Sequence, residues 1–325
     1  MKPISMIDPS TNQLFFRGIN ATKLSGDSSF ERVLYLLIHG QLPSNQELDA
    51  ISDRMAEFRS FYDSEVDSLF KLAWNLEEIK EDNKLNLRDT LLTFVSLAPL
   101  VVANEYGIAQ GKMIKKPKKQ LGHAANFLWM TKGVMLTETE LDDFQTSLIL
   151  HMDDPQNPSL STLEAAVRDG KSISEVLSSA LNVHSGPLHH GAGHEAMMMF
   201  QEIREQANVR KYLEQRLKSG EKLYGLGHRI YRGIDPRAVV LREMLERRTL
   251  KTKNEWLLKV SDSVVKYGRL LLSEYKGIDA YPNVDLYNAA VYFTFGFPPE
   301  LNTSLFAISR SAGWMAHILD LFKSD

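Results

Sequence analysis

The stretch SNQELDAISDRMAEF at residues 44–58 carries the pattern that decides the fold class. Ser44 and Glu47 have the spacing of a capping box, in which the two side chains satisfy backbone amides at the start of a helix. The apolar residues that follow recur at every third or fourth position, as on one face of an α-helix. They are Leu48, Ile51, Met55 and Phe58. This segment therefore predicts an amphipathic helix.

The helical pattern extends over most of the chain. Thr137 with Glu140 and Ser172 with Glu175 open two more helices with the same capping spacing. Further helices are predicted at 29–39, 88–106, 194–217, 238–249, 254–275, 284–295 and 303–322. Alternation typical of strands is confined to a possible short hairpin around 5–16. The predicted fold class is all-α.

The composition is that of an ordinary globular protein and excludes several classes of function. The chain has 325 residues, of which 43% are hydrophobic, so it can bury a sizeable core and divide into two domains. A net charge of −3 gives no overall electrostatic reason to bind nucleic acid or a membrane. Cysteine is absent, which excludes disulfides, thiolate metal sites and a cysteine nucleophile.

The N-terminus and the apolar runs bear on the compartment. The first residues, MKPISMIDPS, lack the apolar core of a signal peptide. The longest apolar runs, such as LAPLVVA at 97–103, are too short to span a bilayer, so a cytoplasmic location is expected. The basic run KMIKKPKK at 112–119 is either a solvated loop or a rim that attracts phosphate. It has no interleaved aromatic residues, which disfavours single-stranded nucleic acid as a partner.

Three segments in the second half of the chain each place one proton-handling side chain beside glycine or proline. They are SGPLHHGAGHEA at 185–196 with His189, GLGHRIYRGIDPR at 225–237 with His228, and PNVDLYNAAVY at 282–292 with Asp285. A carboxylate can remove a proton from carbon while imidazoles stabilise charge on carbonyl oxygens, as carbon–carbon bond formation through an enolate requires. Each of the three residues taken alone is more often a structural hydrogen-bonding group than a catalytic one. Together they favour an active site.

Arginines add to this interpretation. Arg232, Arg237 and Arg310 lie near or after these segments, and the planar guanidinium suits carboxylates and phosphates. Each of them alone is equally compatible with a structural ion pair, because a buried arginine needs an anionic partner.

Metal and dinucleotide sites are not predicted. His190 and His194 would share one helix face, but Met198 stands where the zinc-protease pattern needs its second histidine. The Gly-x-Gly at 225–227 opens no strand-to-helix unit, so a dinucleotide fold is disfavoured.

The segments quoted above resemble those of the citrate synthase and 2-methylcitrate synthase family. GPLHHGAGHEA is similar to the GPLHGGA-type segment of the family, and GLGHRIYRGIDPR and PNVD are similar to its following motifs. The resemblance extends to FRGINATKLSGDSSFERVLYLLIHGQLPS at 16–44, NFLWM at 126–130 and SLFAISRSAGWMAHILD at 304–320. It therefore covers almost the whole chain.

The resemblance implies a citrate synthase-like two-domain helical fold. The large domain would comprise residues 1–189 and 300–325, and the small domain, which carries the CoA-binding loop, residues 190–299. It also implies a homodimer, and the apolar helix at 88–106 adds to that expectation because a monomer would leave too much apolar surface exposed.

The resemblance implies a role for each site residue in an acyl-CoA:2-oxo acid acyltransferase of the tricarboxylic acid cycle type. His189 would polarise the thioester, Asp285 would take the α-proton, and His228 would polarise the ketone of a 2-oxo acid such as oxaloacetate. Other residues would bind the acceptor, namely Arg237, Arg310, His151 and Asp154. Arg232, Leu226 and Gly227 would bind coenzyme A. The CoA thioester, acetyl or propionyl, would be a substrate, with no tightly bound cofactor and no metal.

The chain departs from the family pattern at three places. In HMDDPQNPSLS at 151–161, Asp154 stands where the family has a second histidine, and an added carboxylate would weaken binding of a dianion. His190 replaces a glycine, and the sequence ends at Asp325, before the family's tail arginine. These departures leave open a relative that uses another 2-oxo acid, one that cleaves citryl-CoA, or a catalytically silent dimeric paralogue.

Overall fold

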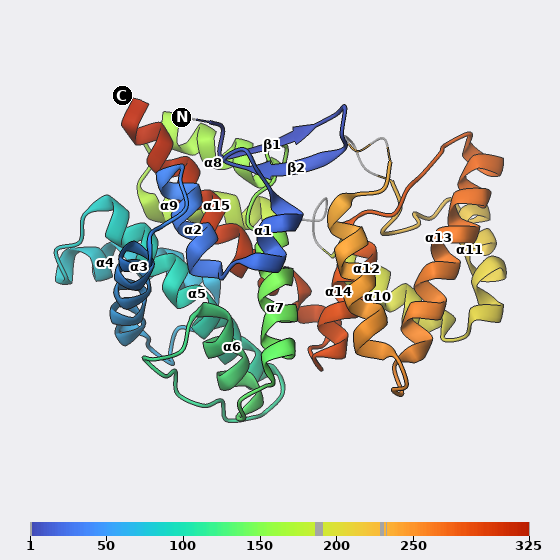
Figure 1. Cartoon of the computed structure of the whole chain (residues 1–325), viewed down its shortest axis with the longest axis horizontal. Helices are drawn as coiled ribbons and strands as arrows, with labels where there is room; N and C mark the ends of the chain where they lie inside the picture. Colours follow the sequence, from blue (N-terminus) through green and yellow to red (C-terminus); the bar gives the residue numbers. More distant parts are fainter. Residues whose placement is uncertain (1, 186–190, 228–230, 232, 325) are drawn as a thin grey trace. The chain divides into compact units, whose positions relative to one another are not determined.

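The computed structural model of the chain describes residues 2–185, 191–227, 231 and 233–324, and Figure 1 shows its path. These residues divide into two compact units. The first unit comprises residues 2–6, 15–185 and 304–324, and the second comprises residues 7–14 and 191–303. Helices dominate both units, which confirms the all-α fold class.

The first unit contains most of the helices. Strands β1 (Ser5–Asp8), β2 (Gln13–Phe16) and β3 (Ile19–Asn20) form a sheet in that order, with residues 7–14 assigned to the second unit, so the predicted hairpin at 5–16 is confirmed. The helices of this unit are α1 (Ala21–Asp27), α2 (Phe30–His39), α3 (Asn45–Phe58), η1 (Arg59–Phe61), α4 (Leu69–Asp82), α5 (Leu87–Ala109), α6 (His123–Lys132), α7 (Glu138–Leu150), α8 (Pro158–Arg168), α9 (Ile173–His184) and nearly all of α15 (Asn302–Ser324).

The second unit is smaller and contains α10 (Ala192–Ile203), η2 (Gln206–Asn208), α11 (Val209–Lys218), α12 (Pro236–Thr249), α13 (Glu255–Lys276), α14 (Val284–Thr294) and η3 (Pro299–Leu301). Helix α14 packs against α10 and α12, and α13 packs against α11. The first turn of α14 carries Asp285, so this packing positions the proposed base.

The predicted capping boxes are present at α3, α7 and α9, with both of their reciprocal hydrogen bonds. At α3, the backbone amide of Glu47 donates to Ser44 Oγ at 3.3 Å, and that of Ser44 donates to Glu47 Oε2 at 2.8 Å. The local sequence therefore fixes where these helices begin.

The single helix predicted at 194–217 is wrong, because the chain breaks there. Helix α10 ends at Ile203, and Arg204 adopts a φ of 54°. A left-handed residue cannot continue a right-handed helix, so the chain makes the short turn η2 before α11 starts at Val209.

Helix α5 forms the core of the first unit and packs against α3, α4 and α6 (Figure 1). It is long and apolar enough to span a membrane by length and composition, although 89% of its most apolar stretch is buried inside the structure. That burial marks it as a core helix, and it removes the apolar surface of this helix as an argument for a dimer.

The start of α6 is held by a residue far away in the sequence. Its N-cap residue, Gly122, offers no side chain, and Glu31 Oε1 accepts the backbone amide of His123 at 2.7 Å instead. The ring of His123 is fully buried and stacks on Phe30, with ring centroids 3.8 Å apart. Burial lowers the pKa of His123 well below 6.5, and the nearby Arg59 cation lowers it further.

Because His123 stays neutral in the folded state and gains a proton only on unfolding, stability should fall as the pH drops below 6.5. We expect His123→Phe to reduce that loss by up to about 1.4 kcal/mol per pH unit. Urea unfolding of both proteins between pH 7.5 and about 5 would measure it. His39 stacks on Tyr35 but is only partly buried, so His39→Phe is the matched control for replacing a stacked imidazole by a phenyl ring. Equal slopes for wild type and His123→Phe would contradict the prediction.

Candidate active site

Several of the predicted site residues lie outside the part of the chain that the structure describes. These are His189, His228 and Arg232. The remaining ones fall into two groups by unit. The second unit holds Asp285, Arg237, Leu226 and Gly227, and the first unit holds His151, Asp154 and Arg310.

Asp285 lies in the first turn of α14 and is partly exposed. Its backbone amide donates to Oδ1 of the N-cap residue Asn283 at 3.0 Å. The positive end of the helix dipole stabilises a carboxylate at this position. The N-cap residue Asn283 therefore fixes the backbone of Asp285 at the start of the helix, and the side chain stays partly exposed.

The glycine loop at 225–227 and the segment before Asp285 are bonded to each other through their backbones. Leu226 and Pro282 form an antiparallel bridge. The amide of Gly227 donates to the carbonyl oxygen of Tyr281 at 2.7 Å, and that of Asn283 donates to the carbonyl oxygen of Gly225 at 3.0 Å. The structure thus brings two predicted motifs together within one unit.

Glycines make this close approach possible. Gly225 has a φ of +78°, and a Cβ at this position would lie 2.8 Å from Cα of Leu286. A Cβ at Gly268 of α13 would in turn collide with the side chain of Leu226. The side chain of Leu226 therefore packs against α13, and the loop presents its backbone.

Arg237 forms a buried ion pair with Asp235 of the same DPR motif. Its Nη2 lies 2.9 Å from Asp235 Oδ2, and neither side chain is more than 2% exposed. Asp235 also accepts the backbone amide of Arg237 at 2.9 Å as the N-cap of α12. The guanidinium is thus fixed in one orientation, and its predicted contact with the acceptor stays a prediction.

In the first unit, His151 and Asp154 lie in the turn that follows α7. The ring of His151 is fully buried, and its Nδ1 lies 2.5 Å from the carbonyl oxygen of Ser147. This contact places a proton on Nδ1 and fixes the orientation of the ring. Asp154 Oδ1 accepts the backbone amide of Gln156 at 3.1 Å. The turn therefore holds both side chains in defined places.

Arg310 of α15 belongs to the same cluster. Its Nε donates to the carbonyl oxygen of His151 at 2.9 Å, and the side chain is 1% exposed. Three residues that were predicted to bind the acceptor, and that are up to 159 positions apart, are thus gathered within the first unit.

Comparison with known proteins identifies the family. The sequence model described as "Citrate synthase, C-terminal domain" matches residues 2–324. The chain belongs to the citrate synthase family. This confirms the resemblance seen in the motifs.

This citrate synthase family member is similar to its relatives over nearly the whole of its length. It is 31% identical to the citrate synthase of Haloferax volcanii, over 99% of this chain and 89% of that one. It is 30% identical to the 2-methylcitrate synthase of Mycobacterium tuberculosis, over 98% of this chain and 83% of that one.

Solved structures agree with the sequence relatives. The citrate synthase of Thermotoga maritima superimposes with a TM-score of 0.84 at 30% identity, over 98% of this chain and 87% of that one. The citrate synthase of Thermoplasma acidophilum, in a ternary complex with carboxymethyl coenzyme A and oxaloacetate, gives a TM-score of 0.86 at 25% identity, over 99% and 89%. The predicted citrate synthase-like helical fold is thereby confirmed.

Two residues beyond the predicted set support residues of the predicted site. Asn283 caps the helix of Asp285, and Asp235 orients Arg237. The sequence carried a signal for both, since Asn283 belongs to the PNVD motif and Asp235 to the DPR motif. Asp153, between His151 and Asp154, had no such signal.

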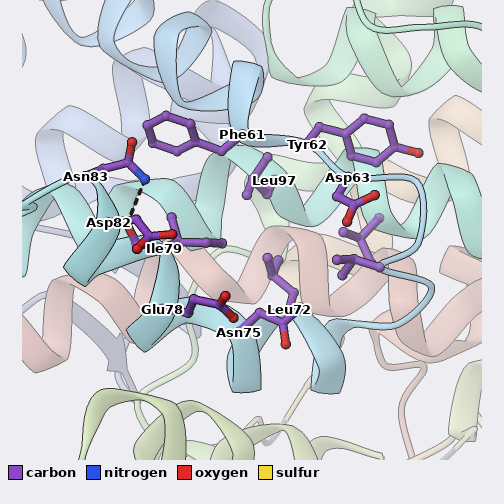
Figure 2. Close-up of a pocket in the computed structure, with 12 residues that line it drawn as sticks. Phe61, Tyr62, Asp63, Leu72, Asn75, Glu78, Ile79, Asp82, Asn83 and Leu97 are labelled. Atoms are coloured by element: carbon purple, nitrogen blue, oxygen red, sulfur yellow. Dashed lines mark hydrogen bonds between the residues drawn. The ribbon is translucent and has the colours of Figure 1, made fainter.

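Within the described residues, no group of three or more His, Asp or Glu side chains is arranged to hold a metal ion. A cavity of about 320 Å³ opens between η1, α4 and α5 (Figure 2), and Asp63, Glu78 and Asp82 are among its lining residues. None of the predicted site residues lines it. Chemistry of the citrate synthase type is therefore not assigned to this cavity.

Proposed function

We propose that this chain condenses an acyl-CoA, acetyl-CoA or propionyl-CoA, with oxaloacetate and then hydrolyses the thioester. The family match over residues 2–324 carries this conclusion. The relatives include both citrate synthases and a 2-methylcitrate synthase, which supports the pair of acyl donors. Another 2-oxo acid, citryl-CoA cleavage and a silent paralogue are not favoured by these relatives.

In the proposed reaction, Asp285 removes the α-proton of the acyl-CoA. Its place at the N-terminus of α14 supports this role, because the carboxylate is stabilised by the helix and its side chain remains partly exposed. By motif position, His189 polarises the thioester carbonyl and His228 polarises the ketone of oxaloacetate. Hydrogen bonds to both oxygens would stabilise the charge that develops as the carbon–carbon bond forms.

The two carboxylates of oxaloacetate are assigned to arginines. Arg237 and Arg310 are both buried, and the ion pair with Asp235 holds the Arg237 guanidinium in one orientation. His151 and Asp154 complete the proposed acceptor site. The position of Asp154 predicts that oxaloacetate binds less tightly here than it would beside a histidine, since like charges repel.

Coenzyme A is assigned to the loop at 225–227. Leu226 and Gly227 would contact the adenine through their backbone, which agrees with the packing of the Leu226 side chain against Gly268. Arg232 would approach the phosphates. Coenzyme A enters as part of a substrate, and no tightly bound cofactor is proposed.

Three further features are proposed from the family resemblance. The large and small domains would have the boundaries given above, 1–189 with 300–325 and 190–299. The protein would act as a homodimer, and it would act in the cytoplasm within the tricarboxylic acid cycle.

The test is a thiol-release assay that pairs acetyl-CoA and propionyl-CoA with a panel of 2-oxo acids. We expect release of coenzyme A that depends on oxaloacetate, with a kcat/KM of about 10⁴ M⁻¹s⁻¹ or above for the preferred acyl-CoA. Two other acceptors serve as comparisons. Pyruvate lacks the second carboxylate of oxaloacetate, and 2-oxoglutarate carries it one carbon farther from the ketone. Thiol release with another 2-oxo acid but not with oxaloacetate would contradict the proposal.

A further inference from the structure

One face of α15 contacts the turn at residues 151–154, which we call the acceptor turn. The contacting residues of the helix are spaced by three, four and seven positions and so share that face. They are Arg310, Gly313 and His317. The acceptor turn is thus held by a rigid helix rather than by a mobile loop.

The contacts bind the turn at both of its ends. Arg310 Nε donates to the carbonyl oxygen of His151 at 2.9 Å, and His317 Nε2 lies 2.9 Å from Asp153 Oδ2. Just beyond the turn, Trp314 Nε1 donates to Ser159 Oγ at 3.1 Å. A Cβ at residue 313 would lie 2.6 Å from Asp153 Oδ1 and closer still to the Met152 carbonyl oxygen. Only glycine lets the helix come this near.

Asp153 is the centre of this contact. Its side chain is fully buried, and Oδ2 is bonded both to His317 and to the hydroxyl of Ser5 in β1. Burial alone would raise the pKa of Asp153, but His317, Arg310 and Ser5 together hold it below 3.8. Burial of a carboxylate costs free energy unless the carboxylate is paired. A buried carboxylate at this place therefore suggests a specific role.

The titratable and charged groups around this carboxylate come from several elements. His317 and Arg310 approach from α15, Glu164 of α8 lies 3.9 Å from Nδ1 of His317, and Asp154 follows in the chain. Asp153 itself is fixed by residues of two elements, His317 of α15 and Ser5 of β1. In the sequence it lies between His151 and Asp154, which are assigned to the acceptor. It has no assigned contact with a substrate.

We propose that Asp153 is a positioning residue, which His317 and Ser5 hold so that the acceptor turn aims His151 at oxaloacetate. The inference rests on the proposed function and adds a determinant of acceptor binding to it. A shift of the turn would disturb the binding of oxaloacetate, while the acyl-CoA residues in the other unit would keep their places.

The first variant is Asp153→Asn, which keeps the size of the side chain and removes its charge. We expect the KM for oxaloacetate to rise about 10-fold or more, since a misplacement of about 1 Å can cost about 100-fold. The KM for the acyl-CoA should stay unchanged. Calorimetric titration with oxaloacetate, without acyl-CoA, should show the same weakening directly.

The matched control is Asp320→Asn on the same helix. Asp320 Oδ2 lies 2.8 Å from Nη2 of the buried Arg17, so the variant also removes a charge pair of α15. That pair does not touch the acceptor turn. We expect a loss of thermal stability in Asp320→Asn without a rise in the KM for oxaloacetate.

A second pair of variants covers the case in which Asp153→Asn does not fold. His317→Gln places an amide donor close to the position of Nε2, and His317→Leu offers none. We expect the glutamine variant to keep most of the affinity for oxaloacetate and the leucine variant to lose it. Such a rescue separates positioning from a general loss of stability.

The outcomes distinguish this inference from the proposed function. A wild-type protein that neither binds nor condenses oxaloacetate overturns the proposed function, and the inference with it. An active wild type in which Asp153→Asn raises the KM for oxaloacetate no more than Asp320→Asn does, or in which the two His317 variants behave alike, overturns the inference alone.

Discussion

Asp285→Asn is expected to lower kcat by about 100-fold or more, the scale that is typical of losing a positioned general base. Asparagine has the shape of aspartate but cannot take a proton from carbon. The hydrogen bond to Asn283 uses the backbone amide of residue 285, so it survives the substitution. The fold and the affinity for coenzyme A should therefore change little.

The measurement combines steady-state kinetics with exchange of the α-protons of the acyl-CoA into deuterated water. Both rates should fall together if Asp285 performs the enolisation. Glu255 also lies in the first turn of a helix of the second unit and pairs with Lys259 at 3.1 Å. Glu255→Gln is thus a matched control for the loss of a charge at a helix start, and it should leave kcat unchanged. An Asp285→Asn protein that keeps most of its activity would exclude this residue as the base.

Among substitutions of glycine by alanine in the second unit, Gly225→Ala is expected to have the largest effect on stability and activity. The left-handed backbone costs an alanine about 1–2 kcal/mol, and a Cβ 2.8 Å from Cα of Leu286 adds about 1–3 kcal/mol of overpacking. Leu286 follows Asp285, so relief of the collision moves the base as well. We expect a loss of about 2–5 kcal/mol in the free energy of unfolding and a kcat lower by about 100-fold.

Gly227→Ala supplies the matched comparison. Gly227 has a φ of +86°, but a Cβ there would meet no atom within 4 Å. Its cost should be limited to the backbone, about 1–2 kcal/mol. Urea unfolding and the thiol-release assay measure both variants. Equal losses at the two positions would show that the contact with Leu286 is not what requires glycine at residue 225.

Local signals in the sequence predicted much of the fold. The capping boxes at Ser44, Thr137 and Ser172 act over three residues and are independent of the rest of the chain, so these helix starts were correct. Helix α4 was missed even though its buried residues have helical spacing and Ser68 caps it. Helix α8 was also missed, and its first residue is Pro158, at a position where a missing backbone amide costs nothing.

Other features depend on contacts that no local pattern contains. The break at Arg204 needs a left-handed residue inside a stretch that has helical periodicity on both sides. In the site, the Asp285 motif was evident from its own residues, but its backbone pairing with the 225–227 loop was not. The contact between Asp153 and His317 joins residues 164 positions apart, and no pattern in a single sequence predicts such a pair.

The backbone hydrogen bonds between the 225–227 loop and residues 281–283 fix the distance between this loop and the start of α14 within the second unit. If the loop binds the adenine end of coenzyme A, the span from that end to the carboxylate of Asp285 is determined by hydrogen-bonded main chain. Movement of the second unit as a whole would leave this span unchanged. The loop that binds the adenine and the carboxylate of Asp285 would then move as one body. The side chains around the thioester would therefore determine which acyl groups are accepted.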